Sequence, residues 1–217
     1  MWVSVGWNAY RRGLVLEALA FCALVGLYIW RLQALWRPSW WLFVIWLVTS
    51  FLVRGDSLAT LGWRLDNFLA ATRNFVYFLV PAIVAVIVCG LFLGMQYRPP
   101  AHVAEPRRFL GYFLFCVIQQ IGLNSMVTNR LVAAFDGSVG AAILAGAIFG
   151  LLHWPNPVLV PLTAIAGAAM AWLFAKQRNI LTLAIGQAIL GSLVWWAFPL
   201  QWHHSMRVGP GYWKFHF

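Results

Sequence analysis

The chain has 217 residues, of which 63% are hydrophobic and only 9% are charged. A soluble domain carries charge on roughly a quarter of its residues, so this composition excludes a soluble globular protein and predicts an all-α integral membrane protein. The formal net charge of +10 comes from 15 basic against 5 acidic residues, and the basic ones lie singly or in pairs at the ends of apolar segments. That placement is typical of contact with the headgroups of membrane lipids and speaks against nucleic-acid binding.

Seven apolar segments follow one another along the chain. Each is predicted to be helical, because lipid cannot satisfy a free backbone N–H or C=O group. In chain order the predicted spans are Leu14–Trp30, Trp40–Val53, Phe75–Leu93, Phe109–Val127, Val139–His153, Val158–Phe174 and Ile180–Phe198. The second and the fifth are short for a bilayer. We therefore expect a polytopic transmembrane helical bundle of about seven spans.

Two further segments divide the chain. Arg54–Phe75 keeps apolar residues at helical spacing among polar ones, which predicts an amphipathic helix lying at the membrane interface. Its apolar positions are Leu58, Leu61, Leu65, Phe68 and Leu69. Gln96–Arg108 is rich in proline and charge and is predicted to be a linker. It separates N-terminal transmembrane helices with the interfacial helix, residues 1–100, from a C-terminal core, residues 101–217.

Small residues crowd the fifth and sixth spans, in the runs GAAILAGAIFG (140–150) and AIAGAAMAW (164–172). Small side chains allow two membrane helices to approach each other closely. These two helices are therefore predicted to pack against each other at the centre of the bundle.

Polar side chains interrupt three of the predicted helices in the C-terminal half. The fourth span carries Gln119, Gln120 and Asn124, the fifth ends at His153, and the seventh carries Gln187. Polar groups at membrane depth are costly and point to a site. The interval from Gln119 to His153 is 34 residues, and so is the interval from His153 to Gln187. Because each interval is one helix, a turn and part of the next helix, three helices can bring these groups to a similar depth.

Short motifs at these positions resemble a known family. FGLLH (149–153) has the pattern Phe-x-x-x-His, QQIGLN (119–124) lies where the family has Glu-Glu-x-x-x-Arg, and QAILG (187–191) lies where it has His-x-x-x-Asn. In these motifs the chain resembles the CAAX-protease and bacteriocin-processing (CPBP, or Abi) family of intramembrane glutamic endopeptidases. The corresponding positions here are Gln119, Gln120, Asn124, Phe149, His153, Gln187 and Gly191.

The chain departs from the family pattern at the positions that the resemblance links to catalysis. The resemblance implies two glutamates that activate a water against the scissile amide, with His and Asn groups that position the water or stabilise the oxyanion. Here Gln119 and Gln120 stand in their place, and a glutamine has no carboxylate to take a proton from water. Of the positions that carry chemistry only His153 remains, so no catalytic residue is assigned. The other replacements are Asn124 for the arginine, Gln187 for the second histidine and Gly191 for the asparagine.

None of the five carboxylates is predicted to reach the depth of the motif. Glu17 stands near the start of the first span, beside Arg11 and Arg12, and is predicted to be interfacial. The remaining carboxylates belong to the amphipathic segment, to the linker and to a loop: Asp56, Asp66, Glu105 and Asp136.

Two interpretations of the amides remain open. They hydrogen-bond across helices, or they line a neutral pocket for a peptide, lipid or isoprenoid-like ligand, since amides satisfy buried polar groups without a buried charge. His153 is either a hydrogen-bonded residue at the membrane boundary or a ligand to a haem- or chlorophyll-type metal. The cysteines and the pair His203–His204 lack metal-ligand spacing, so no metal and no cofactor is expected.

The favoured interpretation is a degenerate CPBP-like protein that has lost protease activity and works by binding. It would be a scaffold, chaperone or accessory subunit that docks other integral membrane proteins, in a bacterial inner membrane. The alternatives are an active intramembrane endopeptidase of the family, and a lipid-, isoprenoid- or pigment-binding membrane subunit.

Overall fold

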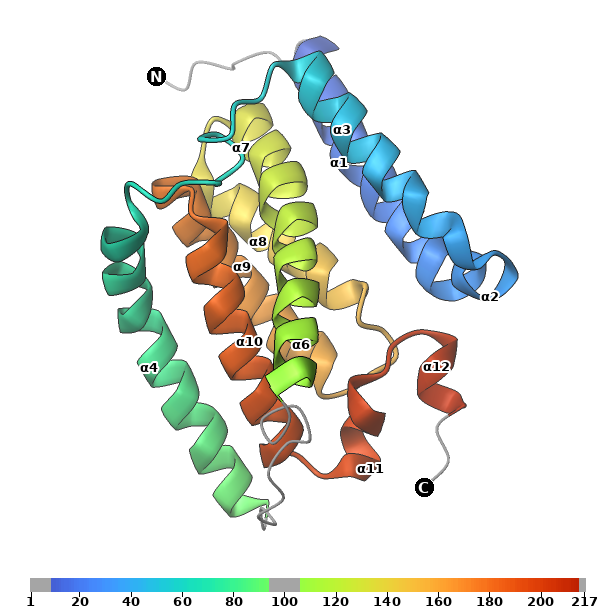
Figure 1. The fold of residues 1–217 in the computed structure, drawn as a ribbon, viewed down its shortest axis with the longest axis vertical. Helices are drawn as coiled ribbons and strands as arrows, with labels where there is room; N and C mark the ends of the chain where they lie inside the picture. Colours follow the sequence, from blue (N-terminus) through green and yellow to red (C-terminus); the bar gives the residue numbers. More distant parts are fainter. Residues whose placement is uncertain (1–8, 94–105, 215–217) are drawn as a thin grey trace, which may run out of the picture.

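The computed structural model describes residues 9–93 and 106–214, and in these ranges the chain forms helices and no strands (Figure 1). Two of the long helices are composite, because short π-helical segments interrupt them. The elements are α1 (Ala9–Leu27), η1 (Tyr28–Leu32), α2 (Gln33–Leu35), η2 (Arg37–Trp40), α3 (Trp41–Arg54), α4 (Phe68–Phe92), α6 (Pro106–Gln120), η3 (Ile121–Thr128), α7 (Asn129–Phe135), α8 (Ser138–Leu151), α9 (Leu159–Gln177), α10 (Ile180–Ala197), α11 (Leu200–His203), η4 (His204–Met206) and α12 (Pro210–Trp213).

Among the described residues, five helices are long and apolar enough to cross a membrane, which confirms the predicted multi-span all-α bundle. They are Ala9–Leu35, Phe68–Phe92, Phe109–Phe135, Leu159–Gln177 and Ile180–Ala197. The other two predicted spans form helices α3 and α8, with 14 residues each. At 1.5 Å per residue such a helix is about 21 Å long, against roughly 30 Å of hydrocarbon. The predicted number of seven spans is therefore not confirmed.

The predicted interfacial helix is wrong over residues 55–67, which form turns, while residues 68–75 are the first turns of α4. Gly55 ends α3 with a left-handed backbone (φ 67°), and Gly62 has φ +86°. A Cβ atom at Gly62 would lie 2.5 Å from the Phe174 ring, so only glycine fits there. Backbone hydrogen bonds within the turns hold this segment, such as Leu61 N–H to the Ser57 carbonyl at 2.9 Å, and the core adds others. Ser125 Oγ donates to Leu61 O at 2.6 Å.

The N-terminal helices lie on two sides of the C-terminal helices (Figure 1). α4 packs along α10 on one side, and α1 packs against η3, α7 and α8 on the other. α3 runs beside α1, farther from the core. Most of the predicted linker Gln96–Arg108 lies outside the described residues, and α6 begins at Pro106.

The predicted packing of α8 against α9 is confirmed by the space around its glycines. A Cβ atom added at Gly146 would lie 2.5 Å from the backbone oxygen of Ala164, and one added at Gly150 would lie 2.7 Å from the Ala164 side chain. A Cβ atom added at Gly167, on α9, would lie 2.9 Å from the Phe149 ring. The two backbones are therefore in near contact, and Phe149, a motif position, is held between them.

Gly146→Ala is expected to destabilise the protein by about 1 to 3 kcal/mol, because the added methyl group meets backbone atoms that cannot move aside. Gly140→Ala, in the same helix with nothing within 4 Å of its added Cβ, is the matched control and is expected to be neutral or slightly stabilising. Thermal unfolding of both variants in one detergent measures the difference. Equal melting temperatures would contradict the close contact of α8 with α9.

Candidate functional site

The helix α6–η3–α7 carries the first motif in an unusual backbone. Its middle part, η3, is a π-helix of eight residues that begins directly after Gln120. Thr128 Oγ1 donates to the Leu123 carbonyl five residues earlier, at 2.8 Å, and so follows the wider turn. π-helical segments are rare and occur frequently at functional sites. Here the π-helix contains Asn124, which is completely buried.

Four amide side chains at the motif positions bind one another in a chain that joins α10 to α6 and η3. Gln187 Nε2 donates to Gln119 Oε1, and Gln120 Nε2 donates to Gln187 Oε1 at 2.6 Å. Asn124 Nδ2 in turn donates to Gln120 Oε1. Gln120 is completely buried, as is Asn124. The amides of the first and third motifs are thus brought together, and each satisfies the other.

Two further residues complete the chain. Thr128 Oγ1 lies 3.0 Å from Asn124 Oδ1, and Gln120 Nε2 also points to Met170 Sδ at 3.2 Å. Met170 belongs to α9, so the amide chain touches three helices of the core. Sequence reasoning found the amides but not Thr128 or Met170, since neither stands out in an apolar helix.

His153 makes different contacts. Its Nδ1 lies 2.7 Å from the Phe149 carbonyl, one turn earlier, and its ring meets the Phe149 ring edge-on with centroids 4.7 Å apart. No hydrogen bond in the described part of the chain joins His153 to the amides. The His153 side chain therefore bonds to the backbone at the C-terminal end of α8 and not to the amides of the other two motifs.

Gly191, at the position of the family's asparagine, faces a tyrosine. A Cβ atom added there would lie 1.9 Å from the Tyr112 hydroxyl oxygen, which comes from α6. The space that an asparagine side chain needs is therefore occupied by Tyr112.

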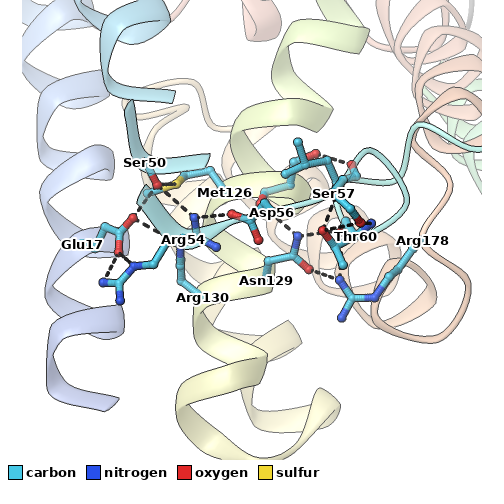
Figure 2. Close-up of polar contacts among 12 residues, drawn as sticks. Glu17, Ser50, Arg54, Asp56, Ser57, Thr60, Met126, Asn129, Arg130 and Arg178 are labelled. Atoms are coloured by element: carbon cyan, nitrogen blue, oxygen red, sulfur yellow. Dashed lines mark hydrogen bonds and ion pairs between the residues drawn. The ribbon is translucent and has the colours of Figure 1, made fainter. Parts of the chain in front are cut away.

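Two of the carboxylates, Glu17 and Asp56, form a half-buried ion-pair cluster with two arginines (Figure 2). Arg54 donates to Glu17 Oε2 through Nε at 2.9 Å and Nη2 at 2.6 Å. Arg130 donates to Glu17 Oε1 at 3.2 Å and to Asp56 at 2.7 Å. Ser50 bridges them, donating to Glu17 and accepting from Arg130. The sequence prediction placed Glu17 at the interface beside Arg11 and Arg12. It did not find Ser50, Arg54 and Arg130 as partners, because they lie far from Glu17 in the sequence.

The same end of the bundle holds the turn segment by its backbone. Asn129 Nδ2 and Arg178 Nη1 both donate to the Thr60 carbonyl, at 2.9 and 3.0 Å (Figure 2). Asn179 Nδ2 donates to the Arg64 carbonyl at 2.7 Å. Residues of α7 and of the α9–α10 turn thus fix the segment 55–67 across the end of the core.

Every carboxylate that the structure describes is paired with an arginine. Asp66 pairs with Arg64, whose guanidinium holds the pKa of that carboxyl below its usual range, and Asp136 pairs with Arg11. Glu105 lies outside the described residues. No described carboxylate therefore takes the place of the two glutamates in the motif.

Asn156 joins the C-terminal segment to the start of α9. Asn156, completely buried, donates to the carbonyls of His203 at 2.8 Å and of Arg207 at 3.0 Å. Its oxygen accepts from the N–H groups of Val158 and Leu159 at the start of α9. The described residues hold no group of three or more side chains suited to a metal.

This architecture defines a class: a helical membrane protein whose internal polar groups pair with one another. Residues 106–193, from the start of α6 into α10, match the model of a family described as type II CAAX prenyl endopeptidase Rce1-like. Residues 106–193 are therefore similar to the CPBP family, and the resemblance drawn from the motifs is confirmed for this part of the chain. Searches of curated proteins and of solved structures found no match.

Arg130→Met is expected to destabilise the fold by about 3 kcal/mol, because it leaves the half-buried Glu17 and Asp56 without the buried guanidinium that pairs them. Arg12→Met, at an exposed position of α1, is the matched control and is expected to change stability by less than about 0.5 kcal/mol. The measurement is unfolding in a common detergent. If both variants unfold together, the cluster does not hold the N-terminal helices to the core.

Proposed function

We propose that this protein is a catalytically inactive CPBP-type membrane protein that acts as a scaffold, chaperone or accessory subunit of a membrane protein complex. The observation that carries the proposal is that hydrogen-bonded glutamines occupy the positions of the family's two glutamates. Gln119 and Gln120 are both tied into the amide chain. A neutral amide does not take a proton from water, and intramembrane hydrolysis by this family's route requires that step.

The pairing of the carboxylates supports the proposal. Glu17 and Asp56 accept hydrogen bonds from Arg54 and Arg130, so neither carboxylate is free of an arginine. His153 has no carboxylate partner among the described residues, and a histidine without an orienting partner is a poor base for amide hydrolysis.

The exposed surface of the bundle suits lateral contacts in a membrane. α3 exposes apolar residues along one face, with Trp41, Ile45, Val48 and Leu52 outward. Such faces meet lipid or another membrane protein. We place the protein in a bacterial inner membrane, with other integral membrane proteins as its partners.

The first test is a cleavage assay on a prenylated CAAX peptide with the purified protein in liposomes. We expect no cleavage by the native chain, because the base is missing, and no difference in His153→Ala. An active type II CAAX endopeptidase in the same liposomes shows that the assay works. Cleavage by the native chain that is lost in His153→Ala would instead establish the alternative, an active endopeptidase with rearranged chemistry.

The second test is recovery of the protein from native membranes in mild detergent, with crosslinking before lysis. A stable complex with other membrane proteins is the expected result, and a lone monomer would contradict the proposal. An absorption spectrum of the same preparation tests the pigment-binding alternative, which predicts a visible band.

A further inference from the structure

The hydrogen bonds of the amide chain have one direction, and Met170 fixes it. A thioether sulfur accepts hydrogen bonds and does not donate them. Gln120 presents one side-chain atom both to Met170 Sδ at 3.2 Å and to Gln187 at 2.6 Å. That atom must therefore be the amide nitrogen, whose two hydrogens serve the two acceptors.

The orientation of every other amide follows from this one. Gln187 must offer its oxygen to Gln120 Nε2, so its own nitrogen faces Gln119, which in turn must offer its oxygen. On the other side, Gln120 Oε1 requires a donor, which is Asn124 Nδ2. Asn124 Oδ1 lies 3.0 Å from Thr128 Oγ1, whose single hydrogen is shared with the Leu123 carbonyl at 2.8 Å. The amide donors thus all point from Asn124 toward Gln119, and aligned hydrogen bonds of this kind polarise and strengthen one another.

The chain ends at Gln119 Nε2, which carries the last two N–H groups. No described residue accepts a hydrogen bond from them, and Gln119 is partly exposed. Gln119 Nε2 is also absent from the buried side-chain atoms that lack a partner. The terminal donor is therefore accessible from outside the protein.

Its surroundings are apolar and face lipid. Phe115 is 52% exposed and Ile118 is 64% exposed, both on α6 within a turn of Gln119. Gln119 stands ten residues into the span Phe109–Phe135, about 15 Å from its start and so near the middle of a bilayer. Lipid chains hold no acceptor at that depth, and ester carbonyls lie at the interface. A free N–H donor there is costly until an acceptor arrives.

We propose that Gln119 Nε2 is the donor of a docking site on α6 for a transmembrane segment of a partner protein, which supplies a carbonyl oxygen from an Asn or Gln side chain or from its backbone. This proposal rests on the proposed function and names the contact through which partners bind. A peptide segment is the occupant that fits, because it brings a carbonyl to mid-membrane depth together with apolar surface that covers Phe115 and Ile118.

The test uses the full chain in lipid nanodiscs, labelled with ¹⁵N-glutamine, and two synthetic probes. One probe is a polyleucine transmembrane peptide with a single central asparagine, and the other is the same peptide with leucine at that position. We expect the asparagine peptide alone to shift the side-chain NH₂ signals of Gln119, which are assigned by their loss in Gln119→Met. Equal shifts with both peptides, or no shift with either, would overturn the proposal.

Affinity gives the second readout. Gln119→Met keeps the length of the side chain and removes its N–H groups, so the asparagine peptide should bind about three- to twentyfold more weakly. Ile143→Met, at an exposed apolar position of α8 outside this surface, is the matched control and should bind as the native chain does. Unchanged affinity in Gln119→Met rules the donor site out. Should that variant fail to fold, the NMR comparison of the two probes with the native chain decides alone.

Failure of this proposal is distinguishable from failure of the proposed function. If native partners are recovered equally with the native chain and with Gln119→Met, the binding function stands and Gln119 is not its contact. If the native chain recovers no partner, the proposed function fails, while the peptide probes still decide whether Gln119 is a donor site.

Discussion

Lipid offers no hydrogen-bond partner, so every polar group inside this bundle must find one within the protein or in a neighbour. Three sets of contacts meet that constraint. The amide chain joins α6, η3 and α10, the cluster around Arg130 joins α1 and α3 to α7, and the carbonyls of residues 60–64 receive donors from the core. Each set crosses between elements far apart in the sequence. The position of the N-terminal helices against the core depends on them as well as on apolar packing.

The same constraint limits chemistry. A carboxylate that is ionised in a membrane needs a cation beside it. Glu17 accepts from two arginines, and Asp56 accepts from one of them. The amides have no basic group at all. The arrangement that makes these polar residues tolerable inside the bundle therefore pairs the described carboxylates with arginines and the amides with one another.

The helices and the motif positions could be predicted from the sequence because both are local signals: apolar runs, and fixed spacing within a turn. The cluster around Arg130 could not, because Glu17 stands 113 residues away and no local pattern pairs them. The turn segment 55–67 was misread for the same reason. Its leucines have helical spacing, but Gly62 has φ +86°, which is not helical, and donors from distant helices bind the carbonyls of Thr60 and Leu61. Tertiary contacts overrode local periodicity there.

Glutamine and glutamate have nearly the same shape, yet the surroundings of these positions distinguish them. Gln120 must donate to Met170 and to Gln187 while it accepts from Asn124, and a carboxylate can only accept. A glutamate at this single position would leave Gln187 without its donor and place a charge in an apolar core. Each amide of the chain thus favours an amide at the next position. The amides at these positions therefore form one interdependent set of hydrogen bonds.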